Sequence, residues 1–300
     1  MLILTMNYTS EKPAEAEPVS VEHILEVLRD TLPELAKDLI ASSHDLSDPL
    51  EQNFVDSPDS PAEHSPRWHQ YGILTHSEMF RRFIEIDAPV LMERWDLLDK
   101  ADAALSQEIE GTSKADLLQI VALVHDLGKF TARTFEYKND EPLARFVNHE
   151  AHSGAIIRSE FKGTLQKLGL SEAQIEHIAK CAEHHFDLGT ARQTAIDNGG
   201  YTLSFARSEA FTKVAQGIIR ASPDIALEIG LMFMADSLSK TEVASTADTD
   251  ESIELDRARL EQEIKDKNLD QRLINQALQQ PVNIEIGRRY LQLWAAQQTA

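Results

Sequence analysis

The hydrophobic residues of the 300-residue chain recur mostly at the spacing of an amphipathic helix. Units that alternate strands with helices, which would indicate a parallel sheet, are absent from the pattern. The pattern therefore predicts an all-α protein in which roughly ten helices form a bundle. Helices are expected after Ser20, from Pro33, and over residues 73–87, 90–109, 113–127, 149–168, 172–186, 205–221, 223–240, 252–278 and 281–297.

Local chemistry marks several of the predicted helix ends. Thr112 or Ser113 is placed to cap the helix that follows, because a hydroxyl can accept hydrogen bonds from the first free amides. Ser171 and Gln174 have the spacing of a capping box. Gly128 is placed to end the helix over residues 113–127.

Prolines and polar runs predict the breaks between helices. Pro33 is placed to start a second short helix, one helix is expected to end at Asp87 before Pro89, and the last helix is expected to begin at Pro281. Residues 44–66 contain four prolines and are expected to form a long loop. Residues 131–147 break the helical rhythm and predict a small hairpin or loop.

The charge balance narrows the classes of partner. The chain has 50 Asp and Glu residues against 29 Lys and Arg residues, a formal net charge of −21. Such a surface repels polyphosphate backbones and anionic membranes, so a nucleic-acid-binding protein with a broad positive face is disfavoured. The single cysteine, Cys181, excludes an intrachain disulfide and suits a reducing cytosol. No apolar run approaches ~18 residues and the apolar start is too short for a secretion signal, so we expect a cytoplasmic protein outside membranes.

Histidine and aspartate residues concentrate at the ends of apolar helices. The stretch QIVALVHDLGKFTARTFEY, residues 119–137, begins as a buried helix and then places His125 beside Asp126, with Lys129 shortly after. Other metal-ligand types stand in similar surroundings at His76, His149, His184, His185 and Asp236.

Any one of these residues taken singly is most simply a core or surface residue satisfied by its neighbours. Together, however, separate helices offer imidazole and carboxylate in apolar surroundings, a set that suits one or two divalent ions of Mn, Fe, Co, Ni, Mg or Zn. A thiolate zinc site is excluded because the chain has one cysteine. The pattern therefore predicts a metal site built between facing helices of a bundle.

The order of His76, His125–Asp126 and Asp236 resembles the HD superfamily of metal-dependent phosphohydrolases. The motifs HDLGKFTARTFEY and RFVNHEAHSGA are most similar to the HD region of CCA-adding enzymes and bacterial poly(A) polymerases. In HEAHSGA, three residues separate Glu from Gly where that pattern has two, and the motifs of a nucleotidyltransferase head are not found. The resemblance spans about residues 70–240 and implies a free-standing HD-domain helical bundle with extra N- and C-terminal helices.

The resemblance also implies roles for individual residues. One ion would be bound by His76, His125, Asp126 and Asp236, and a second by His149, His184 and His185, with Asp126 bridging both. Asp126 and Lys129 would be catalytic, and Lys129 and Arg133 would bind the substrate phosphate, although Arg133 alone is equally well explained by a surface ion pair. Lys240 follows Asp236 by one turn and would either support it or be solvated. His69, His152 and His177 are secondary candidates, whereas His23, His44 and His64 are interpreted as ordinary residues.

The implied function is hydrolysis of a phosphoester, in a nucleotide or similar small phosphorylated compound, by a metal-activated water. The sequence HHFDLGTAR lacks the Gly-Tyr-Pro extension of cyclic-dinucleotide hydrolases, and Lys129–Phe130 replaces the Glu–Asp pair of alarmone hydrolases. Two other interpretations stay open: a di-iron oxygenase with the same ligand set, and a non-catalytic nucleotide-binding regulatory module.

The predicted organisation has four parts. They are a disordered tail over residues 1–19, N-terminal helices and the long loop over 20–69, the HD metal-binding domain over 70–240, and a linker with C-terminal helices that pack on the bundle over 241–300.

Overall fold

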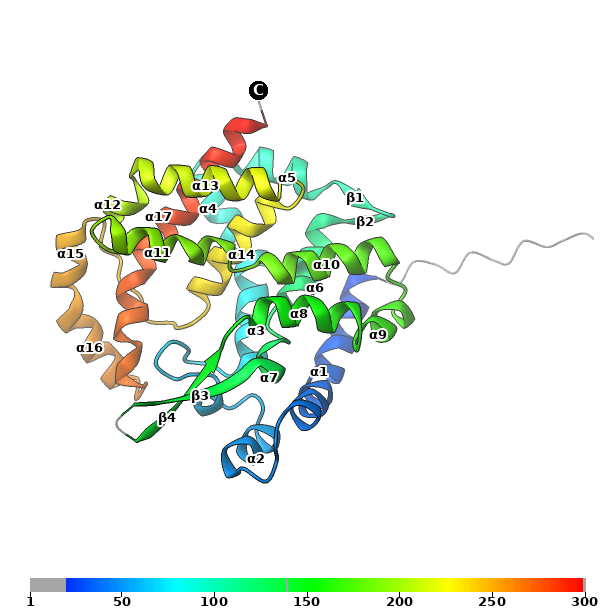
Figure 1. Cartoon of the computed structure of the whole chain (residues 1–300). Coiled ribbons are helices and arrows are strands. Elements are labelled where there is room, and N and C mark those ends of the chain that lie inside the picture. The colour runs from blue at the N-terminus through cyan, green and yellow to red at the C-terminus, as the bar shows by residue number, and fades with distance from the viewer. Residues whose placement is uncertain (1–19, 139, 299–300) are drawn as a thin grey trace, which may run out of the picture.

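The computed structural model of the chain describes residues 20–138 and 140–298. Within these ranges nearly all regular structure is helical, and four short strands pair into two antiparallel ribbons (Figure 1). The predicted all-α class is confirmed. The predicted disordered tail over residues 1–19 lies outside the described residues.

The elements follow one another in this order. The first half of the chain contains α1 (Val21–Ser43), α2 (Pro49–Asp56), the 3₁₀ turn η1 (Pro61–Glu63), α3 (Ile73–Arg82), the π-helical segment η2 (Phe83–Asp87), α4 (Ala88–Arg94), α5 (Leu98–Leu105), β1 (Glu108–Ile109), β2 (Thr112–Ser113), α6 (Lys114–Val124), α7 (Lys129–Ala132), β3 (Arg133–Lys138) and β4 (Glu141–Phe146). The second half contains α8 (His149–Arg158), α9 (Lys162–Lys167), α10 (Glu172–His184), the 3₁₀ turn η3 (Asp187–Thr190), α11 (Ala191–Asp197), α12 (Leu203–Ala206), α13 (Glu209–Ala221), α14 (Ala226–Leu238), α15 (Asp250–Leu255), α16 (Arg257–Asp266), the 3₁₀ turn η4 (Gln271–Leu273) and α17 (Ile274–Gln297).

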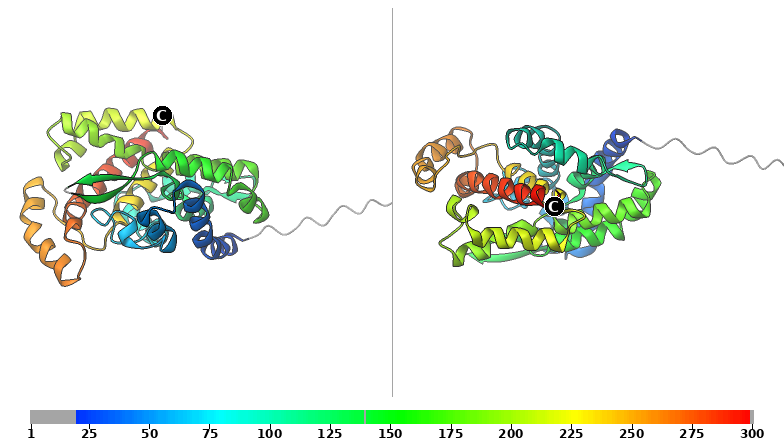
Figure 2. Two further views of the ribbon diagram at one scale, coloured as in Figure 1. Left: turned by 60° about the horizontal axis from the view of Figure 1, so that its bottom comes forward. Right: turned by 90° about the horizontal axis from the view of Figure 1, so that it is seen from above.

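Two apolar helices, α6 and α14, form the centre of the bundle. Nearly every side chain of α14 is buried, and α6 is buried from Leu117 to Val124 except at Gln119. Helix α6 packs against α1, α3 and α10, whereas α14 packs against α3 and α17. The views in Figure 2 show α15 and α16 at the opposite end of the molecule from α1. The polar residues that end or interrupt α6 and α14 are consequently held by the most buried helices of the fold.

The predicted helix boundaries at three prolines are wrong. Helix α1 continues through Pro33, α17 continues through Pro281, and α3 runs by way of the π-helical segment η2 into α4, past Pro89. Proline removes one amide donor and so leaves the carbonyl four residues earlier without its helical partner. At Pro281 this carbonyl belongs to Ala277, and the backbone N–H of Ser245 donates to it over 3.0 Å. The linker before α15 therefore compensates for the missing hydrogen bond.

The predicted hairpin and N-terminal helix caps are confirmed, whereas the predicted long loop is wrong. The hairpin is confirmed as β3 paired with β4, and Ser113 and the Ser171–Gln174 capping box cap α6 and α10 as predicted. Residues 44–66 are not one long loop, because they contain α2 and η1. Asp48 caps α2 and the side chain of Phe54 is fully buried, so this segment is tied to the core. In the described part of the chain, no helix combines the length and apolar character needed to cross a bilayer.

Candidate metal centre

A first group of ligand atoms lies where α3, the end of α6 and α14 meet. Nε2 of His76 is 3.2 Å from Oδ1 of Asp236 and 3.8 Å from Oδ2 of Asp126, and Nε2 of His125 is 3.3 Å from the same Oδ2. All four side chains are buried, and their ligand atoms lie within 4.8 Å of one another. Two imidazoles and two carboxylates thus converge on one point.

A second group shares Asp126 with the first. His149 at the start of α8 places Nε2 3.3 Å from Oδ1 of Asp126, and His185 after α10 places Nε2 3.8 Å from the same oxygen. One oxygen of Asp126 therefore faces His76 and His125, whereas the other faces His149 and His185. The carboxylate has the position of a bridge between two sites.

Each of the four histidines is held so that Nε2 points inward. Three of them donate Nδ1–H to the backbone carbonyl three residues earlier: His125 to Ala122 over 2.9 Å, His149 to Phe146 over 2.8 Å and His185 to Ala182 over 2.7 Å. The fourth, His76, donates Nδ1–H to Oγ of Ser239 over 3.3 Å, while that hydroxyl donates to a carbonyl of α14. A proton fixed on Nδ1 leaves the Nε2 lone pair free, which is the arrangement that metal-binding histidines need.

The electrostatics favour a cation at this centre. In the described part of the chain, His125 Nε2 and Asp126 Oδ1 are buried without a hydrogen-bond partner, a costly state unless a ligand binds them. Burial would raise the pKa of Asp126, but His125 and Lys129 outweigh it and hold the pKa well below its usual range. Burial also lowers the pKa of His185 to about 3. The carboxylate is thus charged and this imidazole neutral, the protonation states that divalent ions bind.

Gly128 has another role than the predicted one. Helix α6 already ends at Val124, and Gly128 has φ −61°, so it is not a left-handed helix terminator. A Cβ at this position would lie 2.0 Å from the carbonyl oxygen of His149 and 2.5 Å from the backbone nitrogen of Ser153. The backbone N–H of Gly128 also donates to Ser153 Oγ over 2.8 Å. The missing side chain lets the turn after α6 touch α8, which brings Asp126 close to His149.

The structure does not bring His184 into either group. Its Nδ1 lies 3.0 Å from Oδ2 of Asp187, and about a third of its side chain is exposed. Successive side chains of a helix point about 100° apart, so only one of two adjacent histidines can face the centre. That residue is His185.

The two predicted phosphate-binding residues lie in different places. The Lys129 ammonium is buried and donates to Asp126 Oδ2 over 2.7 Å. The Arg133 guanidinium instead pairs with Glu63 at 2.6 Å and lies between the rings of Phe54 and Phe135. Arg133 therefore stands apart from both ligand groups, and it ties η1 to the hairpin.

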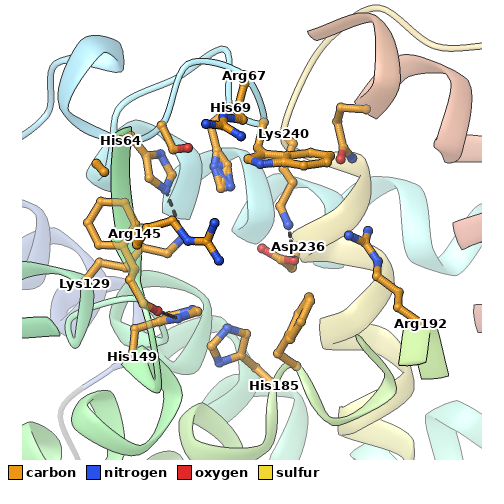
Figure 3. A pocket seen from close by; sticks show the side chains of 16 residues that line it. His64, Arg67, His69, Lys129, Arg145, His149, His185, Arg192, Asp236 and Lys240 are labelled. Carbon is orange, nitrogen blue, oxygen red and sulfur yellow. Dashed lines mark hydrogen bonds and ion pairs between the residues drawn. The ribbon is translucent and has the colours of Figure 1, made fainter. Parts of the chain in front are cut away.

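A cavity of about 400 Å³ opens beside the ligand groups (Figure 3). His149, His185, Asp236 and Lys129 form one part of its wall. The remaining polar and aromatic lining comes from His64, Arg67, Trp68, His69, Arg145, Phe146, Phe186, Arg192, Lys240 and Gln276. The cavity is therefore strongly cationic, in contrast to the formal charge of −21 for the whole chain.

Sequence reasoning missed the contribution of the segment before α3. His64, interpreted as ordinary, is fully buried, and its Nε2 lies 2.9 Å from Lys129 Nζ. His69 stacks on His76 with ring centroids 5.1 Å apart, and both of its ring nitrogens lack a partner in the described ranges. Burial lowers the pKa of both residues well below 6.5. The available signal was the basic, aromatic run HSPRWHQ directly before the helix of His76.

Of the other secondary candidates, one contacts a ligand residue and two lie outside the ligand groups. Lys240 pairs with Asp236 at 2.7 Å and is mostly buried, so it supports that ligand and is not solvated. The Nδ1 atom of His152 lies 3.0 Å from Thr131 Oγ1, and His177 packs near Glu228, away from both ligand groups.

Comparison with known proteins identifies one family. The family described as HD domain matches residues 100–240, a segment that contains every member of the two ligand groups except His76. No curated protein and no solved structure matches the chain.

Proposed function

Residues 100–240 form an HD domain, and from this premise we propose that the protein is a phosphohydrolase that cleaves a phosphoester of a small phosphorylated compound, such as a nucleotide. The position of Asp126 carries the proposal, because its two oxygens face two separate pairs of histidines beside a cationic cavity. A carboxylate shared in this way suits a centre of two divalent ions.

The donors fit such ions in number and type. His76, His125, Asp126 and Asp236 would hold one ion, and Asp126, His149 and His185 would hold the other. Imidazole and carboxylate donors suit Mn, Fe, Co, Ni or Zn. Bound ions of this kind lower the pKa of water and neutralise charge on a phosphoryl group.

Two cations on different elements are available for the phosphate itself. Lys129 follows the ligands on α7, and Arg192 lies on α11 at another side of the cavity (Figure 3). The guanidinium of Arg192 lies 5.0 Å over the ring of Tyr201, and its buried Nε has no partner in the described ranges. A planar guanidinium can donate two hydrogen bonds to a phosphate. We assign Lys129 and Arg192 to binding the phosphate oxygens and stabilising the charge that builds on them.

The size and lining of the cavity favour a small anionic substrate. Ligand cavities usually enclose about 300–1,000 Å³, and this cavity lies near the lower limit. Phe146 and Phe186 offer apolar surface beside the cations, which suits a base or another flat group. The acidic remainder of the chain opposes the binding of a long polyanion.

The test combines metal content with a panel of phosphoesters. The purified protein is loaded with Mn²⁺, Co²⁺, Ni²⁺ or Zn²⁺ and assayed with mononucleotides, dinucleotides and aryl phosphates, next to the Asp126→Ala variant. We expect turnover by the wild type and loss of both metal and activity in Asp126→Ala. The matched control Asp197→Ala, on the exposed face of α11, should keep both.

Other outcomes would point to the competing functions. Full activity and full metal in Asp126→Ala would overturn the assignment of the site. Two irons in the isolated protein without phosphoester turnover would favour dioxygen chemistry. Nucleotide binding without turnover under any metal would favour a regulatory module.

A further inference from the structure

We propose that the substrate is a linear dinucleotide, which extends from the metal-facing cavity into a second, adjoining cavity across Arg67 and Trp68. This inference rests on the proposed phosphohydrolase function and specifies its substrate. The scissile phosphodiester would lie at the ligand groups, and the leaving nucleotide would lie in the outer cavity.

The second cavity, called the outer cavity below, shares part of its lining with the metal-facing cavity, called the inner cavity. It encloses about 500 Å³ and is lined by Arg67, Trp68, Lys138, Glu141, Leu143, Gln271, Arg272, Ile274 and Asn275. Arg67 and Trp68 line both cavities. Strand β4 and the start of α17 also contribute to both, through Leu143 and Ala144 and through Asn275 and Gln276. Three segments thus contribute lining to both cavities, and the two cavities adjoin along them.

Arg67 is the available cation at the junction. In the described ranges 20–138 and 140–298, no hydrogen bond or ion pair joins its side chain to another residue. Two other arginines that line these cavities are already paired, Arg145 with Glu136 at 2.8 Å and Arg272 with Asp270 at 2.6 Å. An arginine left without a carboxylate partner beside a ligand cavity is well suited to a phosphate, especially in so acidic a chain.

The segment that carries Arg67 and Trp68 is anchored on both sides. Nδ1–H of His64 donates to the carbonyl of Tyr71 over 2.9 Å, and the N–H of Gln70 donates to the carbonyl of Lys240 over 2.7 Å. Ser65 adopts φ 85°, a left-handed conformation that costs a non-glycine residue energy and persists where the surroundings impose it. The segment at the junction of the two cavities is therefore held in place near both of its ends.

The chemistry of the junction matches a dinucleotide. The indole of Trp68 can stack on a base, an interaction worth about 1–3 kcal/mol per base. Arg67 can bind the phosphate of the unit that leaves. In the reaction, a water oxygen forms a bond to phosphorus while the P–O bond to the 3′ oxygen breaks, and that oxygen takes up one proton. The products are two mononucleotides, and no oxidant or reductant is required.

The experiment compares two phosphodiesters with different leaving units. The leaving unit of the first is a nucleotide with its own phosphate and base, and that of the second is nitrophenol, which has neither. The wild type, Arg67→Ala, Arg67→Lys and Trp68→Ala are assayed with 5′-phosphorylated dithymidine and with the p-nitrophenyl ester of thymidine 5′-phosphate. We expect Arg67→Ala to lower kcat/KM for the dinucleotide at least about tenfold more than for the ester, the scale of one lost charge-assisted contact. Arg67→Lys should restore part of the difference, and Trp68→Ala should raise KM mainly for the dinucleotide.

Arg220 is an exposed arginine of α13, and Arg220→Ala should leave kcat/KM unchanged for both substrates. Equal losses on both diesters in Arg67→Ala would overturn the dinucleotide inference while leaving the phosphohydrolase assignment intact. Absence of turnover of either diester and of aryl phosphates by the metal-loaded wild type would overturn both.

Discussion

The Lys129 ammonium donates a hydrogen bond to Nε2 of His64 over 2.9 Å. His64 can accept it because its own Nδ1–H is donated to the carbonyl of Tyr71. Burial, followed by the charge of Lys129, lowers the pKa of His64 well below 6.5, so the ring stays neutral. The lysine proposed to bind phosphate is thus fixed between the bridging carboxylate of Asp126 and a histidine from a different segment. Such support places a charged group before the substrate arrives.

His64→Ala is expected to lower kcat by about tenfold, because Lys129 loses one of its two hydrogen-bond partners. His64→Gln offers an amide oxygen near the position of Nε2 and should retain more of the activity. Metal content should stay unchanged in both variants, since His64 belongs to neither ligand group. Steady-state kinetics and metal analysis check this expectation, with the exposed His23→Ala as control. A loss of metal in His64→Ala would mean that it acts as a ligand.

Single-ligand variants should separate the two ions. Asp236→Ala removes a donor of the first group only and should lower the metal content by about one ion per chain, as should His185→Ala for the second group. Asp126→Ala removes the shared carboxylate and should lower the content of both. Elemental analysis of the purified variants measures the stoichiometry.

His184→Ala is the matched control for this series, because it alters the neighbouring histidine that points to Asp187. Its metal content should equal that of the wild type. A loss of one ion in this variant would show that His184 turns inward when metal binds, as the sequence motif alone implied.

Arg133→Ala is expected to act on stability. Removing one partner of a fully buried ion pair commonly costs about 3–5 kcal/mol, and the loss here should fall below that range because Glu63 is partly exposed. Here Glu63 would lose its partner at 2.6 Å, and the rings of Phe54 and Phe135 would lose the guanidinium between them. Urea unfolding should show this loss, whereas Glu63→Gln with Arg133→Met should recover part of it. A raised KM with unchanged stability would instead favour direct phosphate binding.

Gly128→Ala should disturb the second ligand group. The added Cβ would lie 2.0 Å from the carbonyl oxygen of His149, so α8 must move away from Asp126. We expect lower affinity for the ion held by His149 and a loss of stability of about 1–3 kcal/mol, the usual cost of overpacking. Metal titration and urea unfolding measure both effects.

Gly163→Ala provides the comparison, because a Cβ in this position of α9 meets nothing within 4 Å. In an open helical position alanine is favoured over glycine by about 0.5–1 kcal/mol, so this variant should be neutral or slightly more stable. Equal effects of the two substitutions would mean that the contact between the turn and α8 is not tight.

The helical class could be predicted because its signal is local, whereas the division of the ligands into two groups was implied by the resemblance to the HD superfamily. Apolar periodicity defines α6 and α14, and His125–Asp126 follows directly from the first of them. The continuous helix through Pro281 could not be predicted in this way, because the donor that satisfies Ala277 is Ser245, in a linker far from it in sequence. Tertiary contacts of this kind override local propensity.

The sequence was equally unable to separate His184 from His185, or to find His64. Which of His184 and His185 faces the ligand groups depends on the rotation of the last turn of α10. The position of His64 beside Lys129 depends on how the irregular segment before α3 packs on α7. Irregular segments have no hydrophobic period, so the direction of their side chains cannot be inferred from spacing. Arg133 shows the reverse case, in which a motif position suggested a ligand contact and a nearby glutamate binds it instead.

His177 provides a test of pH dependence away from the ligand groups. Burial, with a smaller contribution from Lys114, lowers its pKa from 6.5 to about 4, and its Nε2 lies 3.6 Å from Glu228. As pH falls below 6.5, the unfolded chain takes up the proton before the folded protein does. The free energy of unfolding that His177 contributes is therefore fully present above pH 6.5 and is lost towards pH 4, by roughly 3 kcal/mol at most.

His177→Gln should accordingly flatten the fall of the free energy of unfolding between pH 6.5 and pH 4. Urea unfolding at several pH values measures this slope, with a chelator present so that the metal ligands titrate alike in both proteins. His23→Gln, which changes a largely exposed side chain of α1, should leave the slope as it is in the wild type. If His177→Gln and the wild type lost stability in parallel, the pKa of His177 would be the same in the folded and the unfolded chain. A steeper fall in His177→Gln than in the wild type would mean that the histidine is protonated in the fold, paired with Glu228, with the sign of its contribution reversed.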